Sequence, residues 1–284
     1  MANTVVAELE PKHLWKRFYE ITQVPRPSKK EEKIRAHLRE LLKSLKTEFK
    51  EDATGNIVAL LPATPGHENA PTIVLQGHVD MVCEKNSDIA HDFDKDPIQA
   101  WIDGEWVKAK GTTLGADDGI GIAAQLAILE ANDIEHGPVE CIFTIDEETG
   151  MTGAFGLQPG FMKGKILINL VSEDEGELFI GCAGGMDTVA EFKYRTKMVP
   201  ANSVAYKISV TGLNGGHSGD EIDKGLGNAN KILNRIIYSA YKKFKVRLSY
   251  FNGGNLRNAI AREAFGSVTI KEKFAGDFEK LVTG

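Results

Sequence analysis

Hydrophobic positions recur with helical spacing in three segments of the first half of the chain. The stretch "PKHLWKRFYEITQV" (11–24) has this period, and "PRPS" then interrupts it. A second helix is expected over "KKEEKIRAHLRELLKSLK" (29–46), where Ser28 and Glu31 match the capping box that begins many helices. A third helix is expected over "GIGIAAQLAILEAN" (119–132).

Short apolar runs between and after these helices predict buried strands. The runs are "NIVALLPA" (56–63), "TIVLQGH" (72–78), "VECIFTID" (139–146), "KILINLV" (165–171) and "GELFIGCAG" (176–184). Strands that alternate with helices, and that are apolar on both faces, indicate an α/β fold whose central sheet carries helices on both faces.

The pattern changes near Gly184, after which polar and apolar residues alternate. The alternating runs are "DTVAEFKYR" (187–195), "AYKISVTG" (205–212), "VRLSYFNGG" (246–254) and "FGSVTIKEK" (265–273), with a helical segment at 228–244. Alternation of this kind is typical of an antiparallel sheet with one buried face. We therefore expect two domains, at 1–184 and 185–284, the second a smaller α+β domain that breaks off within a new helix.

Composition narrows the classes of function. A net charge of −6 without a long Lys/Arg run argues against binding nucleic acid or an anionic membrane. The start of the chain lacks the layout of a signal peptide, and no apolar run is long enough to span a bilayer. Three widely spaced cysteines (Cys83, Cys141 and Cys182) fit neither a disulfide framework nor a C-x-x-C metal site. These features predict a cytoplasmic protein.

A histidine and several acidic residues gather where predicted strands end or a helix begins. They are His78 and Asp80 in "GHVD", Asp117 and Asp118 in "GADDG", and Asp146, Glu147 and Glu148 in "IDEETG". In open α/β sheets, ligands bind at the carboxyl edge of the strands. Crowded carboxylates repel one another unless a cation compensates, and an imidazole among carboxylates suits Zn²⁺ or a similar ion. One such motif alone usually consists of polar residues on the protein surface, but the three together predict a metal site.

Two competing motifs are weaker. "GIGIAA" (119–124) matches a dinucleotide-binding fingerprint, but no apolar strand leads into it and two aspartates would repel a pyrophosphate there. "DFDKDP" resembles the start of an EF-hand loop, yet Pro97 stands where glycine is needed and Asp103 replaces the bidentate glutamate. The second is better explained as a solvated acidic loop.

Several longer motifs resemble those of a known family. They are "LQGHVDMVCEKN", "GTTLGADDGIGIA", "TIDEETGMTGA", "GELFIGCAGG", "GGHSGDEI" and "GGNLRNAI". Together they resemble the aminoacyl-histidine dipeptidases (cytosolic Xaa-His dipeptidases) of the di-zinc aminopeptidase and dipeptidase clan, from the first helix to Gly284. The resemblance implies a zinc-peptidase catalytic domain with a mixed central sheet, followed by the first part of a lid domain.

The resemblance also implies roles for individual residues. His78 would bind one zinc ion, Glu148 the other, and Asp117 would bridge both. Asp80 would orient the imidazole of His78, and Glu147 would be the general base. The peptide bond between Asp117 and Asp118 would be cis.

In the lid, His217 would hydrogen-bond the tetrahedral oxyanion and Asn258 would contact the substrate. A lone histidine among turn glycines is more often structural, so the assignment of His217 depends on the family match. The relatives are commonly homodimers, which predicts a homodimer here.

Two departures from the family qualify this interpretation. Val171 stands where an aspartate ligand is expected, and the family's last zinc ligand, a histidine, falls in a longer chain, beyond Gly284. Three hypotheses remain from the sequence. The first is a zinc-dependent dipeptidase acting on Xaa-His and related dipeptides, and the second is a truncated, catalytically impaired relative that binds at most a metal ion or a partner. The third, a nucleotide-binding enzyme, depends on "GIGIAA" alone.

Overall fold

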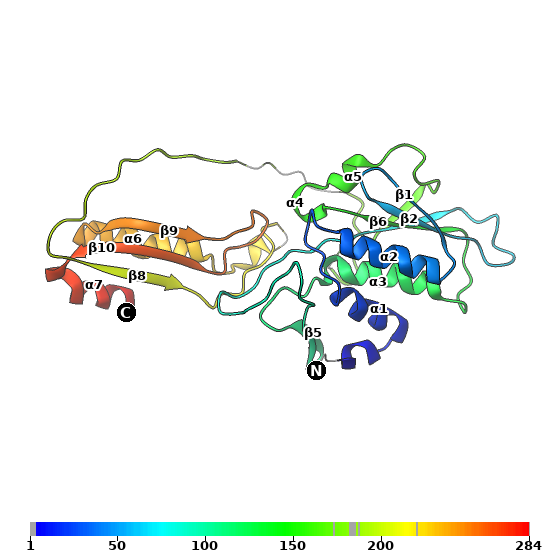
Figure 1. Ribbon diagram of the computed structural model, residues 1–284, viewed down its shortest axis with the longest axis horizontal. Coiled ribbons are helices and arrows are strands. Elements are labelled where there is room, and N and C mark those ends of the chain that lie inside the picture. The colour runs from blue at the N-terminus through cyan, green and yellow to red at the C-terminus, as the bar shows by residue number, and fades with distance from the viewer. Residues whose placement is uncertain (1–3, 173, 182–185, 187, 220, 284) are drawn as a thin grey trace. The chain divides into compact units, whose positions relative to one another are not determined.

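The computed structural model describes residues 4–172, 174–181, 186, 188–219 and 221–283. The chain divides into two compact units, Met1–Ala183 and Gly184–Gly284, each with its own sheet. Figure 1 shows the helices and strands of both units in chain order. No helix among the described residues is long and apolar enough to cross a membrane. Cys83 and Cys141 are free thiols, and Cys182 lies outside the described residues.

The first unit is built on a five-stranded mixed sheet. Its order is β1 (Glu48–Glu51), β2 (Ile57–Leu61), β6 (Val139–Thr144), β3 (Ile73–His78), β7 (Ile166–Asn169). Strand β3 runs parallel to both β6 and β7, whereas β2 is antiparallel to β1 and β6. The mixed α/β sheet predicted from the sequence is therefore confirmed. Because β3 and β6 are parallel, their carboxyl ends lie at the same edge.

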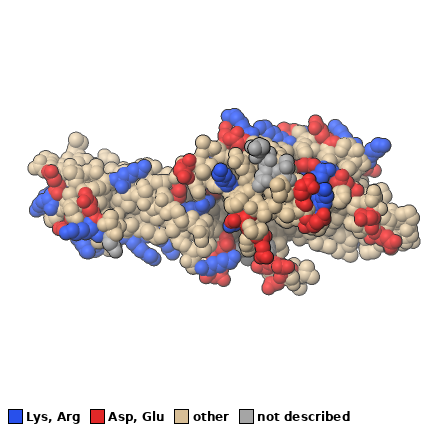
Figure 2. Space-filling view, turned by 90° about the horizontal axis from the view of Figure 1, so that it is seen from below, with Lys and Arg blue, Asp and Glu red and all other residues tan. Residues whose placement is uncertain are grey.

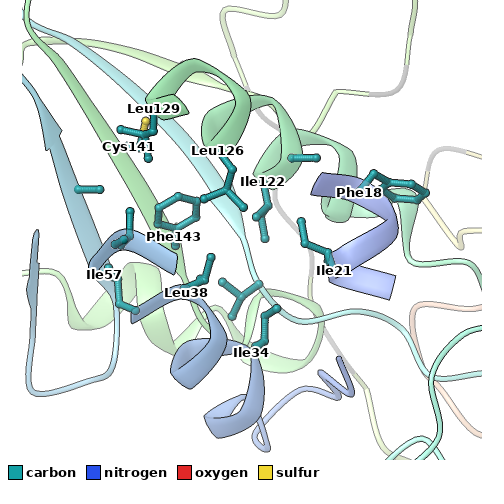
Figure 3. Packing of buried hydrophobic residues seen from close by; sticks show 14 of the residues in the cluster. Phe18, Ile21, Ile34, Leu38, Ile57, Ile122, Leu126, Leu129, Cys141 and Phe143 are labelled. Atoms are coloured by element: carbon teal, nitrogen blue, oxygen red, sulfur yellow. The ribbon is translucent and has the colours of Figure 1, made fainter. Parts of the chain in front are cut away.

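Three helices cover one face of this sheet: α1 (Lys12–Thr22), α2 (Glu32–Ser44) and α3 (Ala116–Glu130). Figure 3 shows Leu38 of α2 and Leu126 of α3 beside Phe143 of β6, and Phe18 of α1 belongs to the same buried cluster. Alternate strand residues face the other way: Val74 and its neighbours pack against the segment that follows α5 (Thr152–Gly156). Burial on both faces explains why these strands are continuous apolar runs.

Shorter elements of the first unit carry little periodic signal and were not predicted. They are the 3-10 helix η1 (Thr4–Glu8), strand β1, the hairpin β4 (Ala100–Asp103) and β5 (Trp106–Ala109), and helix α4 (Glu147–Gly150). The predicted capping box is wrong, because helix α2 has Glu31 at its N-cap position with no side-chain cap. The hydroxyl of Ser28 instead donates to Asp80, 2.7 Å away.

The second unit is a three-stranded antiparallel sheet in the order β8 (Ser203–Val210), β10 (Ala264–Lys271), β9 (Arg247–Gly253). Helix α6 (Ala229–Phe244) packs its apolar side on one face of the sheet, and α7 (Ala275–Thr283) adds Phe278 to the same core. Short 3-10 helices, η2 (Ile222–Lys224) and η3 (Glu272–Phe274), complete the described elements. The one-sided antiparallel sheet predicted here is confirmed.

Two predicted strands, 176–184 and 187–195, are absent from the described part of these segments. Residues 176–181 and 188–195 form neither helix nor strand there, and Leu178 and Ile180 are almost fully exposed. A strand is stable only when a neighbouring strand pairs with its backbone, and the described residues provide none beside these segments. Both segments have the apolar residues typical of strands, but such a pattern does not provide a neighbouring strand to pair with.

Candidate metal centre

Strand β3 carries His78 to the carboxyl edge of the sheet, where its side chain is fully buried. Nε2 of His78 lies 3.0 Å from Oδ1 of Asp117, and Nδ1 lies 3.3 Å from Oδ1 of Asp80. Burial lowers the pKa of His78, but interaction with Asp117 and Asp80 outweighs it and raises the pKa to about 11. The surrounding carboxylates therefore favour a positive charge at this position.

Asp80, fully buried, connects three segments of the first unit. Its Oδ2 accepts hydrogen bonds from the Ser28 hydroxyl and from the Glu148 amide at 3.2 Å, and its Oδ1 accepts one from the Glu147 amide at 3.0 Å. Burial alone would raise the pKa of Asp80, yet its interactions with His78 and Ser28 lower it to about 2. This carboxylate is thus held ionised beside the imidazole.

Asp117 and Asp118 lie at the start of helix α3, and the peptide bond between them is cis, as the resemblance predicted. The two side chains point to different partners. Asp117 contacts the imidazole of His78, whereas Oδ2 of the buried Asp118 accepts a hydrogen bond from the His78 amide at 3.0 Å. Burial raises the pKa of Asp118 to about 7.

Glu147 and Glu148 follow strand β6 at the same edge. Asp146 enters this turn with φ of 50°, and its carboxylate accepts hydrogen bonds from the hydroxyls of Thr149 and Thr152. Its amide donates to Oε1 of Glu31 at 3.1 Å. Burial and the nearby Asp117 raise the pKa of Glu148 to about 7, because an ionised carboxylate is costly beside another one.

Among the described residues, two groups of three side chains could offer ligand atoms to one ion, with those atoms all within 4.8 Å of one another. The first consists of His78, Asp117 and Glu148. The second consists of Glu31, Asp80 and Asp146, all buried. Oxygens of the second group accept hydrogen bonds from amides and hydroxyls.

The first group is the better candidate for a metal centre. It combines an imidazole with two partly exposed carboxylates, a donor set that suits a divalent transition metal. A cation there would also relieve the repulsion that raises the pKa of Glu148. The structure thus brings together the three residues predicted as ligands, with Asp80 behind the histidine and Glu147 adjacent to Glu148.

Val171 lies just beyond β7, whose residue Asn169 pairs with Gln76 of β3. The Leu170 amide donates to the Gln76 carbonyl at 2.9 Å, so pairing continues past the strand. Continuing this register by two residues places position 171 beside His78. The valine therefore occupies the sheet edge that carries the ligands, but offers no ligand atom.

His217 and Asn258 belong to the second unit, where they lie on adjacent segments. An isolated bridge joins His217 to Ala259, and the Ser218 amide donates to the Asn258 carbonyl at 2.9 Å. The His217 side chain is exposed, and its Nδ1 accepts a hydrogen bond from the Gly219 amide at 3.2 Å. The two lid residues predicted from the resemblance are thus neighbours within their own unit.

Sequence reasoning missed two contributors, Arg26 and Ser28, in the segment "PRPS". The segment was interpreted as a helix break, with Ser28 as part of a capping box, and its pattern did not indicate a contact with the site. Both side chains reach residues more than fifty positions away in the chain. Only the tertiary structure reveals such contacts.

Comparison with known proteins places this geometry among peptidases. The family described as the peptidase dimerisation domain matches residues 201–283. The chain is 49% identical to the cytosol non-specific dipeptidase of Escherichia coli over 93% of its own length. It is 46% identical to the aminoacylhistidine dipeptidase of Vibrio alginolyticus, with a TM-score of 0.63 over 98% of the chain. The fold is also that of the aminopeptidase PepT of Bacillus cereus, with 22% identity and a TM-score of 0.52.

The chain spans only about half of these dipeptidases, 55% of the Escherichia coli protein and 56% of the Vibrio alginolyticus chain. Within that part, the similarity extends over both units. The comparisons thus confirm the resemblance predicted from the sequence: over this part, the chain is similar to a cytosol non-specific dipeptidase and to an aminoacylhistidine dipeptidase.

Proposed function

We propose that this chain forms the metal-binding part of a zinc-dependent dipeptidase that hydrolyses Xaa-His and related dipeptides. The observation that carries the proposal is the convergence of His78, Asp117 and Glu148 within 4.8 Å of one another, at the sheet edge. The similarity to two dipeptidases favours an enzyme over a catalytically impaired relative. The "GIGIAA" motif lies inside α3 behind the two aspartates, which leaves the nucleotide hypothesis without support.

Zinc bound here would polarise the peptide carbonyl and supply an activated water. His78, Asp117 and Glu148 would hold it as ligands. Asp80 fixes the imidazole of His78, and the carboxylate of Glu147 takes a proton from water and returns it to the leaving amine.

We assign 1–184 as a catalytic domain and 185–284 as the first part of a lid. In the lid, His217 would stabilise the oxyanion and Asn258 would contact the dipeptide. The match of residues 201–283 to a dimerisation domain supports a homodimer, and the name of the Escherichia coli relative supports a cytoplasmic location. In the view of Figure 2, acidic and basic side chains are interspersed, without a continuous basic patch among the described residues of that face.

Replacing Glu147 by glutamine tests the enzymatic role. We expect Xaa-His hydrolysis to fall about 100- to 10,000-fold, because the amide cannot accept the proton that a general base removes. Bound zinc per chain should not change, because Glu147 is not one of the clustered ligands. Steady-state hydrolysis and metal analysis on the same preparations check both. An unchanged rate in this variant would refute the role of Glu147, and a parent protein that binds zinc without cleaving any Xaa-His dipeptide would refute the proposed activity.

Replacing Val171 by aspartate tests the position of the ligand edge. We expect zinc to bind about tenfold more tightly, because a carboxylate beside His78 adds a ligand to an incomplete set. Val171→Asn is the matched control, because asparagine has nearly the same shape as aspartate but carries no charge. Competition with a chelating dye measures both affinities. Equal affinity in the parent and both variants would show that position 171 does not face the metal.

A further inference from the structure

Arg26 is a buried cation that touches both loops of the candidate metal centre. It lies between α1 and α2, and only 2% of it is exposed. Its Nη1 donates to the carbonyls of Val79 and Asp80, at 3.0 and 2.8 Å, and its Nη2 donates to the carbonyl of Gly115. One guanidinium thus joins the loop that carries His78 to the loop that leads into Asp117.

The surroundings of Arg26 are shaped to admit this guanidinium. A Cβ atom at Gly115 would lie 2.5 Å from Nη2, and one at Gly119 would lie 2.8 Å from it, so side chains there would collide with the arginine. The Arg26 backbone is attached as well, because its carbonyl accepts a hydrogen bond from the Met81 amide at 3.2 Å. Arg26 is therefore bound through both its side chain and its main chain to the segment after β3.

The charge of Arg26 is only partly offset by the carboxylates of the acidic centre. No carboxylate among the described residues forms a direct ion pair with it, and its Nε has no hydrogen-bond partner there. Burial lowers the pKa of Arg26, and attraction to Asp80 and Asp118 opposes that decrease. A buried cation without a paired anion is costly, so an arginine that served only to pack these loops would be a poor choice.

We infer that Arg26 is a positioning residue that fixes the separation of His78 and Asp117 and so sets the geometry with which they receive a metal ion. This inference deepens the proposed function, since the metal site is the one assigned above. Arg26 acts through backbone carbonyls. Among the described residues, Arg26 is the only side chain that hydrogen-bonds to a backbone carbonyl in each of the two loops. Replacing it removes this link between them.

The first arm of the test needs no metal. Arg26→Gln, Arg26→Lys and the control Arg17→Gln are compared by amide hydrogen exchange in the full chain. Arg17 is a suitable control because it is similarly buried, on α1, but pairs with Glu130 at 2.8 Å and Glu20 at 2.6 Å. We expect exchange in residues 78–81 and 115–119 to accelerate about tenfold in Arg26→Gln, less in Arg26→Lys and not at all in Arg17→Gln.

The second arm measures zinc affinity at a temperature where every variant is folded. We expect about 10- to 100-fold weaker binding for Arg26→Gln, partial recovery in Arg26→Lys, and parent affinity for Arg17→Gln. If Arg26→Gln does not fold, the lysine variant gives the decision, because it retains the charge but has lost the forked geometry.

The outcomes separate this inference from the proposed function. Parent-like exchange in both loops of the Arg26 variants, or equal zinc affinity in parent and variants, would overturn the positioning role. A parent protein that binds no zinc would instead refute the proposed metal centre, and the exchange arm would still decide whether Arg26 fixes the two loops.

Discussion

Replacing His78 by alanine is expected to weaken zinc binding about 100-fold or more, because the centre loses its only imidazole. The remaining carboxylates, Asp117 and Glu148, would face each other without a nitrogen ligand. The neighbouring loop should stay in place, because Asp80 keeps its hydrogen bonds to Ser28 and to the amides that follow β6. Loss of affinity would therefore report on the ligand itself. Isothermal titration with zinc measures it.

His37→Ala is the matched control for this experiment. His37 is a half-buried histidine of α2 whose Nε2 has no hydrogen-bond partner among the described residues. Its removal is expected to leave zinc affinity unchanged. If the two variants lose affinity equally, the metal is not held at the edge of the sheet. If neither loses affinity, zinc binds elsewhere and His78 is a buried structural histidine.

The central strands of the first sheet could be predicted from the sequence, because a strand that is buried on both faces consists of a nearly continuous apolar run. Runs such as 72–78 and 139–146 are rich in apolar residues, and they became β3 and β6 within two residues. Strand β1 (Glu48–Glu51) escaped because an edge strand with polar residues has no such pattern. The failed predictions at 176–184 and 187–195 show that an apolar pattern alone does not make a strand. The described residues of these segments have no neighbouring strand to pair with.

The clustering of the candidate ligands could be predicted because their positions follow from topology, whereas the role proposed for each residue came from the family resemblance. Parallel strands β3 and β6 end at one edge, so His78 and Glu148 had to lie close together. The supporting residues could not be predicted in this way. Arg26 and Ser28 sit in a segment without period, and their function depends on carbonyl and carboxylate groups that only folding brings within reach. The prediction of Ser28 as a helix cap was wrong because helix α2 begins later, with Glu31 at its N-cap position, and the Ser28 hydroxyl donates to Asp80.

Gly77→Ala is expected to destabilise the first unit by about 3–5 kcal/mol, through overpacking and a broken buried hydrogen bond. An ideal Cβ at this position would clash with Oδ2 of Asp118, at a distance below the 3.0 Å minimum found for real Cβ atoms. It would also lie 2.9 Å from Nε2 of Gln125. Asp118 would have to withdraw, leaving the buried amide of His78 without its acceptor. The backbone at Gly77 lacks a positive φ, so the cost is steric.

Urea unfolding followed by tryptophan fluorescence measures this cost, because all three tryptophans lie in the first unit. Gly181→Ala is the control, since a Cβ there meets nothing within 4 Å and stability should change by less than about 0.5 kcal/mol. In an Asp118→Ala background the clash with the Asp118 carboxylate is removed. The destabilisation caused by Gly77→Ala should then fall to about 1 kcal/mol. If the cost were the same in both backgrounds, the close approach of β3 to Asp118 would not be what requires glycine here. A reduced cost would instead show that the close packing of the strand that carries His78 against Asp118, at the start of the helix that carries Asp117, is what requires glycine at position 77.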